Sequence, residues 1–330
     1  MEIWARASDV PKDFSPTVVT IGIFDGMHRG HQAVLTETVD TAKELGCKSL
    51  VLTFDPHPRQ IHDPDCDLHL VTSVQDRLER LEGFGVDGVV VEHYDKEYAR
   101  LSAHDFVQQE LVGKLHAHAI VVGADARFGA GNEGDVRFLQ RIGAQLGVVV
   151  RVVDDLASHE GRRWSSTWVR ELLARGDVEG AWRILGRPHR IRGIVRHGYK
   201  RGRELGFPTA NLYGENLGEL PADGVYAGWL IRQVAGTKAA EYLPAAISIG
   251  LNPQFGAEQR TVEAHVLGRA DLNLYDEAIA IDFIEYLRPM MKMNSVEELL
   301  SQMDDDLRRS AQALGVPVSH RVNPAEVTAR

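Results

Sequence analysis

The hydrophobic pattern changes once along this chain of 330 residues, and the change limits the folds that the chain can adopt. From Val18 to about Val153, short continuous apolar runs alternate with amphipathic segments, whereas after Gly186 apolar residues recur at every second position. Continuous runs are typical of strands buried on both faces, and a period of two is typical of strands with one buried face. The pattern therefore predicts two domains of different class, 1–186 and 187–330.

The first domain is predicted to be an α/β fold with a doubly wound parallel sheet, because its apolar runs alternate with helical segments. The predicted strands are residues 18–24, 49–54, 87–92, 118–123 and 147–153. We expect helices over 31–45, after Ser73 and after Ser102, where serine is a favourable N-cap. Two further helices, near 167–174 and 177–185, are expected to complete this domain.

The second domain is predicted to be mainly β, an antiparallel Greek-key-like barrel followed by a helix. Its predicted strands are residues 190–196, 225–231, 245–249, 261–267 and 278–284, separated by Gly, Pro and Asn turns. Ser295 and Glu298 have the spacing of a capping box, which predicts a helix that continues to Leu314. The tail over 316–330 is expected to fray.

Composition argues against several classes of protein. No apolar run approaches the length that spans a membrane, and the first residues lack the pattern of a secretion signal, so we expect a cytoplasmic protein with no membrane partner. Cys47 and Cys66 are too few for a disulfide framework or a thiolate zinc site. A net charge of −10 argues against nucleic acid as the main partner. The oligomeric state is not predicted.

Two histidines stand three residues apart in the stretch Gly22-Ile-Phe-Asp-Gly-Met-His28-Arg-Gly-His31. On their own, such histidines are more often surface residues or half of a metal site. Here a strand, a glycine turn and a helix start follow in order, and a helix N-terminus with glycines nearby binds anions. The context therefore predicts that His28 and His31 flank a phosphate. No P-loop motif occurs, so attack at the α-phosphorus fits better than binding in the P-loop manner.

Four further motifs follow this stretch along the chain. They are Thr53-Phe-Asp-Pro-His-Pro58, Val122-Gly-Ala-Asp125, Ser165-Ser-Thr-Trp-Val-Arg170 and Leu205-Gly-Phe-Pro-Thr-Ala-Asn211. Each alone has a simpler explanation, such as a turn, a helix cap or a solvated loop. Their order on one chain resembles that of the prokaryotic bifunctional FAD synthetases, and the resemblance covers essentially the whole length.

The resemblance implies a bifunctional enzyme. The second domain would phosphorylate riboflavin to FMN with MgATP, and the first would adenylylate FMN to FAD with release of pyrophosphate. His28 and His31 would then stabilise charge on the triphosphate. Because the phosphate of FMN is already anionic, this reaction needs positioning and electrostatic stabilisation rather than a general base.

The resemblance also implies which residues bind substrates in the first domain. These are Gly22, Phe24, Gly30, Asp55, His57, Asp125, Ser166, Thr167 and Arg170. Hydroxyls at a helix start and an arginine one turn later suit the phosphates. The chain departs from the family at Ala126, where an aromatic residue is usual, and at Trp164, where an aliphatic residue is usual.

In the second domain the resemblance places a magnesium ion on Thr209 and Asn211, whose oxygens suit a hard cation. Glu263 matches the general base for the neutral hydroxyl of riboflavin, and Arg288 matches a flavin-side position. The residues implied in binding ATP are Gly198, Lys200, Arg203, Gly206, Phe207 and Pro208. Departures are Asp276, where the family favours glycine, and the methionine-rich segment from Met290 to Met293.

Two other interpretations remain open from the residues. The first is an adenylyltransferase with a different phosphorylated acceptor, in which the barrel only binds flavin. The second is a nucleotide- or RNA-binding regulator that uses the segment from Arg187 to Arg203, which carries seven Lys or Arg and no acidic residue. An RNA-binding protein would lose affinity steeply as salt increases.

Overall fold

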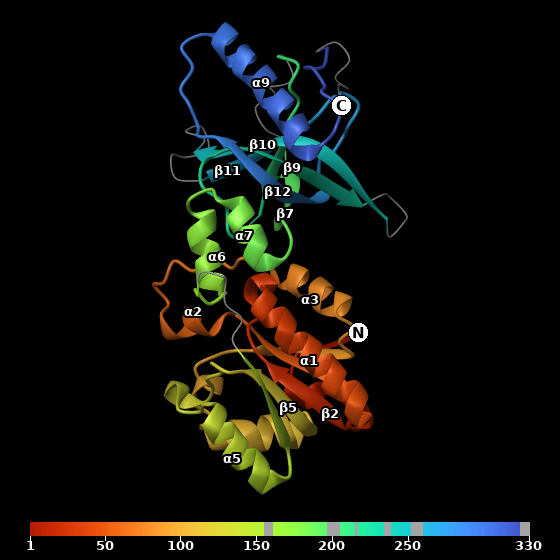
Figure 1. The fold of residues 1–330 in the computed structure, drawn as a ribbon, viewed down its shortest axis with the longest axis vertical. Helices are drawn as coiled ribbons and strands as arrows, with labels where there is room; N and C mark the ends of the chain where they lie inside the picture. Colours follow the sequence, from red (N-terminus) through yellow and green to blue (C-terminus); the bar gives the residue numbers. More distant parts are fainter. Residues whose placement is uncertain (155–160, 197–204, 215–216, 234–238, 252–259, 324–330) are drawn as a thin grey trace. The chain divides into compact units, whose positions relative to one another are not determined.

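A six-stranded sheet and a closed six-stranded barrel occupy successive parts of the chain (Figure 1). The computed structural model describes residues 1–154, 161–196, 205–214, 217–233, 239–251 and 260–323. The chain divides into two units, which are described one at a time. The first unit is Met1–Leu70 with Val74–Ser166, and the second is Val71–Ser73 with Thr167–Arg330.

The sheet of the first unit is parallel throughout, as predicted, with strand order β1-β4-β3-β2-β5-β6. Its strands are β1 (Glu2–Trp4), β2 (Thr17–Ile21), β3 (Lys48–Asp55), β4 (Gly88–His93), β5 (Ala117–Gly123) and β6 (Val149–Val153). The prediction missed β1, which has only three residues. The strand order reverses between β2 and β5, and in such sheets ligands bind at the carboxyl ends of the strands beside this reversal.

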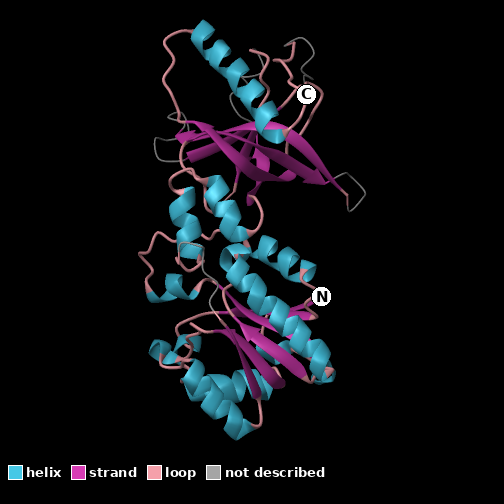
Figure 2. Cartoon of the chain, viewed as in Figure 1, coloured by secondary structure: helices cyan, strands magenta, loops and turns pink. Residues whose placement is uncertain are grey.

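Helices cover both faces of this sheet (Figure 2), which confirms the doubly wound arrangement. They are α1 (Arg29–Leu45), α2 (Pro58–His62), α3 (Val74–Gly83), α4 (Ala103–Asp105), the π-helix η5 (Phe106–Lys114) and α5 (Val136–Leu146). Val18 of β2 packs against Ala42 of α1, whereas its neighbour Val19 lies in the core formed with η5 and α5. Successive residues of a strand point to opposite faces, so a continuous apolar run serves both cores.

Short turns and caps complete the first unit. Single helical turns occur at η1 (Ala7–Asp9), η2 (Lys12–Phe14), η3 (Asp25–Met27), η4 (Tyr98–Arg100) and η6 (Ala130–Asn132). Ser102 caps the helix predicted after it, since its hydroxyl accepts from the Asp105 amide at 3.0 Å. Among the described residues, no helix has the length and apolar character needed to cross a membrane.

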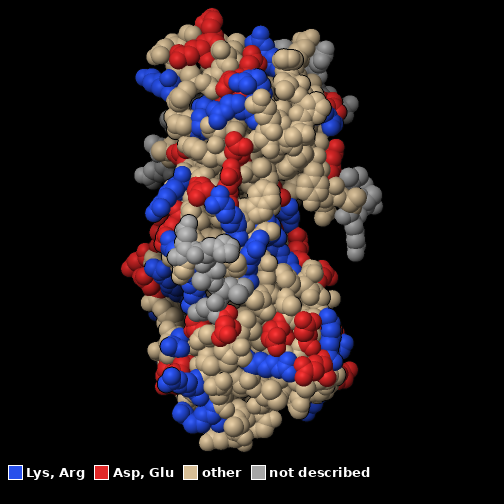
Figure 3. All heavy atoms as spheres, in the orientation of Figure 1, with Lys and Arg blue, Asp and Glu red and all other residues tan. Residues whose placement is uncertain are grey.

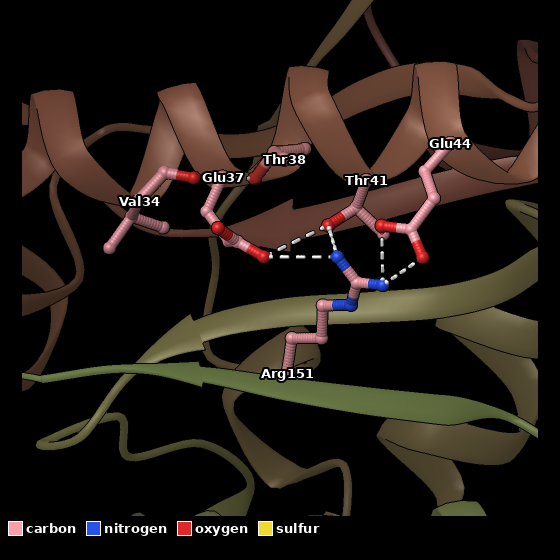
Figure 4. A network of polar contacts seen from close by, with 6 residues as sticks. All are labelled: Val34, Glu37, Thr38, Thr41, Glu44 and Arg151. Carbon is pink, nitrogen blue, oxygen red and sulfur yellow. Dashed lines mark hydrogen bonds and ion pairs between the residues drawn. The ribbon is translucent and has the colours of Figure 1, made fainter.

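Arg151 on the edge strand β6 ties that strand to α1 (Figure 4). Its Nη1 donates to Glu37 Oε1 at 3.1 Å and Thr41 Oγ1 at 2.9 Å, and its Nη2 donates to both Glu44 carboxylate oxygens at 2.8 and 2.7 Å. The three partners are spaced so that they share one face of the helix. Because α1 begins beside His28, this network also helps to hold the helix that carries the histidines.

The helices α6 (Ser166–Leu173) and α7 (Val178–Leu185) belong to the second unit, with the exception of Ser166, which belongs to the first. We expected both helices to complete the first domain. The α7 helix packs on β7 and β12 of the barrel. The Leu173 carbonyl at the end of α6 accepts from the Ala222 amide at 2.8 Å. A functional boundary after residue 186 stays a prediction.

The barrel of the second unit is antiparallel and closed, in the order β10-β11-β8-β7-β12-β9, which confirms the predicted class. Its strands are β7 (His189–Arg196), β8 (Ala210–Tyr213), β9 (Gly224–Gln233), β10 (Ala240–Leu251), β11 (Arg260–Val266) and β12 (Ala278–Arg288). The short strand β8 was not predicted. Its pairing with β11 brings residues 210 and 264 side by side although they are far apart in sequence.

The helix α9 (Val296–Leu314) lies on β9, β10 and β12, and Ser295 caps it by accepting from the Glu298 amide at 3.1 Å. Arg288 at the end of β12 donates from Nε and Nη2 to the two oxygens of Asp306 on α9, both at 2.7 Å. Both side chains are nearly buried. This bidentate pair therefore attaches the helix to the barrel.

The segment after α9 does not fray over its described part. The Val322 amide donates to the Gly206 carbonyl at 3.1 Å. Gly206 has φ of +85°, and a Cβ there would lie 2.4 Å from the Val322 oxygen. Glycine is required because of both its conformation and this close approach. The expectation of a frayed tail was thus wrong up to Asn323, and 324–330 lie outside the described residues.

Candidate active sites

A cavity of about 510 Å³ opens at the carboxyl ends of the strands in the first unit. Residues at or near the ends of four strands line it, namely Ile21 of β2, Phe54 of β3, Val122 of β5 and Val153 of β6. The cavity therefore includes the place where the strand order reverses, the position at which a fold of this type binds ligands.

The loop between β2 and α1 is held in an unusual conformation beside this cavity. Phe24 and Met27 have φ of +53° and +46°, a region that residues other than glycine adopt at a cost. Both side chains are buried, which anchors the loop. Added Cβ atoms would lie 3.0 Å from the Phe24 ring at Gly22 and 3.1 Å from the His28 ring at Gly30. The two glycines thus let the aromatic rings pack against the backbone.

His28 and His31 line the cavity together, as the sequence predicts. Their rings are stacked, with centroids 3.7 Å apart and planes inclined by 21°. His28 is the N-cap of α1, and its Nδ1 accepts from the His31 amide at 3.3 Å. The pair therefore sits where a helix N-terminus presents N–H groups to an anion.

Burial favours the neutral form of both histidines. Burial, reinforced by the nearby Arg163 guanidinium, lowers the pKa of His28 to about 4. Burial also lowers the pKa of His31 well below its usual value, and His28, Arg77 and Arg163 add to this effect. A neutral imidazole still donates one N–H, so the pair can hydrogen-bond phosphate oxygens without itself carrying charge.

Asp125 lines the cavity as predicted, and its carboxylate is paired with Arg163, a residue that the sequence analysis did not single out. Ala126 and Trp164 also line the cavity, so both departures from the family change its wall. The Arg29 guanidinium lies over the Trp164 ring at 5.8 Å from its centroid. The position of Arg163, just ahead of the Ser165-Ser-Thr motif, is a sequence signal that could have identified it as a site residue.

An aromatic wall, also missed by the sequence analysis, forms one side of the cavity. Its members are Phe54, Tyr94, Tyr98, Phe106 and Phe128. Neighbouring rings have centroids 5.5 to 6.4 Å apart. These residues come from separate segments and share no motif. Together they offer apolar, polarizable surface that suits a flat ring system.

Two of the predicted substrate-binding residues do not line the cavity. Asp55 is exposed at the end of β3, and His57 caps the short helix α2 by accepting from the Arg59 amide at 3.0 Å. Neither is among the residues that line the cavity, although the adjoining Pro58 is. The predicted contact of Asp55 and His57 with substrate therefore stays a prediction.

Ser166 donates its hydroxyl to the Asp25 carbonyl at 2.8 Å, next to the histidine loop. Thr167 and Arg170 belong to the second unit, so their predicted contact with the phosphates stays a prediction.

In the barrel, three predicted side chains meet at neighbouring positions of β8 and β11. Glu263 pairs with Asn211 in the strand register. The Thr209 hydroxyl lies 3.4 Å from Glu263 Oε2, and the Asn211 amide group lies 3.5 Å from Thr209 Oγ1. Burial raises the pKa of Glu263, although the Thr209 hydroxyl partly offsets this effect. Pro208 and Thr209 also line a small hollow of about 40 Å³.

This group of side chains fits a magnesium ion. A hydroxyl, an amide and a carboxylate all provide oxygen, the donor that hard divalent cations prefer. Within the described ranges, no three His, Cys, Asp or Glu side chains gather as a metal site. Thr209 and Asn211 would offer oxygen ligands to such an ion.

The remaining kinase-side residues are only partly placed. Phe207 is buried against His265, and Arg288 uses two of its nitrogens to bind Asp306. Gly198, Lys200 and Arg203 lie outside the described residues. Asp276 has φ of +61°, which explains why the family favours glycine there. Met290 and Met291, within the departing methionine-rich segment, are exposed.

Two arginines of the basic segment from Arg187 to Arg203 form ion pairs within the barrel. Arg190 binds Asp282 with Nε and Nη2 at 2.6 and 2.7 Å, and Arg196 pairs with Asp276. On the face drawn in Figure 3, basic and acidic side chains are interspersed. These contacts give the RNA-binding interpretation no support.

Two family models match the chain one after the other. A model described as FAD synthetase matches residues 10–168, and a model described as riboflavin kinase matches residues 185–314. The second match contradicts the interpretation in which the barrel only binds flavin.

Curated relatives match over nearly the whole chain. A bifunctional riboflavin kinase/FMN adenylyltransferase of Pseudomonas fluorescens is 37% identical over 92% of this chain and 94% of its own. The proteins of that name from Escherichia coli K12 and Bacillus subtilis 168 are 33% and 32% identical, and the matches cover 91% and 90% of this chain and 93% and 92% of theirs.

A crystal structure named as a macrolide-efflux protein, from Streptococcus pneumoniae, matches with a TM-score of 0.83 and 27% identity over 93% of this chain and 97% of its own. Its name differs from those of the curated relatives, whereas its fold agrees with the present one over both units. The two family models and the curated relatives agree with each other and with the order of the two units. The chain therefore belongs to the family of bifunctional riboflavin kinase/FMN adenylyltransferases.

Proposed function

We propose which residues carry the two reactions of this enzyme, the phosphorylation of riboflavin to FMN with ATP and the adenylylation of FMN to FAD. The cavity beside the stacked histidines is proposed as the site of adenylyl transfer. The group formed by Thr209, Asn211 and Glu263 is proposed as the site of phosphorylation. The functional boundary is proposed to lie near residue 186.

In adenylyl transfer, a phosphate oxygen of FMN attacks the α-phosphorus of ATP, and pyrophosphate leaves. His28 and His31 donate N–H groups to the phosphate oxygens as negative charge moves toward the leaving group. Ser166, Thr167 and Arg170 are proposed to bind phosphate oxygens. The observation that carries this assignment is the stacked histidine pair at the N-terminus of α1.

The flavin ring is proposed to lie against the aromatic wall of the same cavity. Rings at edge and tilted angles provide stacking surface, and the volume of about 510 Å³ is in the usual range for a small-molecule site. Asp125 and Arg163 provide the polar side of the cavity. Asp55 and His57 are proposed to act through the shape of their loop.

In riboflavin phosphorylation, the Glu263 carboxylate accepts the proton of the attacking hydroxyl. A raised pKa makes this carboxylate a stronger base near neutral pH than an exposed glutamate. Thr209 and Asn211 are proposed to hold magnesium, which would supply positive charge to offset that of the ATP phosphates. The segment with Gly198, Lys200, Arg203 and Gly206 is proposed to bind the phosphates, and Phe207 and Pro208 to stiffen it.

Product analysis separates these assignments. The enzyme, mixed with riboflavin, ATP and Mg²⁺, should form FMN and then FAD. His28→Ala should accumulate FMN and form no FAD. Glu263→Ala should form no FMN from riboflavin but should convert supplied FMN to FAD. A folded variant that lost both reactions would show that the division between the units is wrong.

A further inference from the structure

We infer that His265 is a positioning residue for riboflavin phosphorylation, which places Thr209 beside Glu263 by holding the carbonyl of Pro208. The inference rests on the proposed role of Thr209 as a magnesium ligand. It concerns a side chain that touches neither the metal nor the reacting atoms. Its basis is the way in which the backbone before β8 is held.

The ladder between β8 and β11 ends just before Thr209. Its paired positions are Val262 with Leu212, Glu263 with Asn211, and Ala264 with Ala210. Thr209 is the next residue and has no position in this ladder, and Pro208 before it has no backbone N–H to donate. The main-chain bonds that fix Asn211 therefore do not fix Thr209.

The His265 side chain supplies a bond where the ladder stops. His265 occupies the next position of β11, and its Nδ1 lies 2.8 Å from the Pro208 carbonyl oxygen. A carbonyl only accepts hydrogen bonds, so Nδ1 carries the proton. Nε2 is buried and has no hydrogen-bond partner among the described residues. Among the described residues, the hydrogen bond from Nδ1 to the Pro208 carbonyl is thus the one that this ring makes.

The ring is also fixed in place. His265 is 4% exposed, and its centroid lies 5.5 Å from that of Phe207. Burial lowers the pKa of His265, which agrees with a neutral ring that donates from Nδ1. A buried nitrogen without a hydrogen-bond partner lowers stability, so an apolar side chain would fill this space at a lower cost in free energy than histidine does.

This geometry links the proposed base and the proposed metal ligand through one strand. Glu263 and His265 are two residues apart on β11 and so point to the same side of it. Glu263 lies 3.4 Å from the Thr209 hydroxyl, and His265 holds the residue before that threonine. Two residues of β11 therefore control the distance between the proposed base and the proposed metal ligand: Glu263 is the base, and His265 holds the backbone next to Thr209.

Two substitutions separate the hydrogen bond from the packing. In His265→Asn the amide nitrogen can take the position of Nδ1, whereas in His265→Gln it reaches toward Nε2 instead. We expect His265→Gln to lower kcat/KM for riboflavin phosphorylation about tenfold, mainly through a higher KM for MgATP, and His265→Asn to stay within about threefold of the parent. Conversion of supplied FMN to FAD should not change in either variant.

Amide hydrogen exchange of the enzyme without substrates gives a second readout. Peptides that cover 205–212 should exchange faster in His265→Gln than in the parent, and His265→Asn should resemble the parent. His189→Asn is the matched control. His189 is a fully buried histidine of β7 whose Nε2 lies 2.6 Å from the Glu219 carbonyl oxygen. Its substitution should lower the thermal stability of the barrel without raising the KM for MgATP.

Thr209→Ala, measured in parallel, distinguishes this inference from the proposed function. If Thr209→Ala leaves phosphorylation unchanged, the proposed magnesium site is wrong. If Thr209→Ala impairs phosphorylation but His265→Gln does not, the inference about His265 is wrong. Equal impairment by His265→Asn and His265→Gln would also overturn it, because packing rather than the bond to Pro208 would then explain the effect.

Discussion

The two proposed sites of this enzyme differ in the ionisable side chains that they contain. The first unit has a large cavity with two histidines whose pKa is lowered by burial, and the Asp125 carboxylate there is paired with Arg163. In the barrel, Thr209 lines a small hollow and lies 3.4 Å from Glu263, a carboxylate whose pKa is raised by burial. Under the proposed assignment of the two sites, the acceptor explains the difference. The phosphate of FMN is an anion that needs no base, whereas riboflavin offers a neutral alcohol that benefits from one.

The two units also fasten a helix to their strands in different ways. In the barrel, Arg288 and Asp306 are 12% and 7% exposed and form a bidentate pair between β12 and α9. In the first unit, Arg151 is 30% exposed and its partners Glu37 and Glu44 are 40% and 59% exposed. Water competes for an exposed ion pair but not for a buried one, so equal geometry should not mean equal stability.

The largest expected effect concerns the base in the barrel. Glu263→Gln should lower the rate of riboflavin phosphorylation by about 10²- to 10⁴-fold, the usual contribution of a general base. Only the ionised carboxylate accepts a proton, so the parent rate should fall as pH drops through a midpoint above the ordinary glutamate pKa of 4.5. The variant should lose this acid limb. Rates from pH 4 to 9 would measure it, and an unchanged limb in the variant would assign it to another group.

A smaller effect is expected at the buried ion pair. Asp306→Ala should reduce the free energy of unfolding of the barrel by about 3 kcal/mol, because it leaves the Arg288 charge buried without a partner. Urea unfolding followed by circular dichroism would measure this change. The double variant Arg288→Met with Asp306→Leu should recover most of the stability, since apolar pairs replace buried ion pairs well. If phosphorylation stays impaired in a stable double variant, the predicted flavin-side role of Arg288 gains support.

The smallest effect is expected at the exposed network. Arg151→Ala should cost about 0 to 1 kcal/mol in the free energy of unfolding of the first unit, and the cost should shrink further in high salt. The same urea titration at low and high salt would measure it. A loss as large as that of Asp306→Ala would contradict the comparison and would show that the network is important for holding α1.

Much of this architecture could be predicted from local pattern. The two hydrophobic periods predicted the parallel sheet and the antiparallel barrel, and the motif from Gly22 to His31 predicted that both histidines meet at a helix start. The short strands β1 and β8 were missed because three or four residues carry too little periodicity to detect. The helices after Ser166 group with the barrel, which the sequence pattern could not show, because an amphipathic face shows that a helix packs but not against what.

The sequence by itself determined the fold classes, which follow from hydrophobic periodicity. Its motifs carried the family resemblance, which implied the order of the two activities and the proposed site residues. Only the tertiary structure brought Arg163 to Asp125, collected five aromatic rings into one wall, and placed His265 beside Pro208. It also buries His28 and His31, which lowers the pKa of both. Burial and long-range contacts control these properties, and both depend on residues that are distant in the sequence.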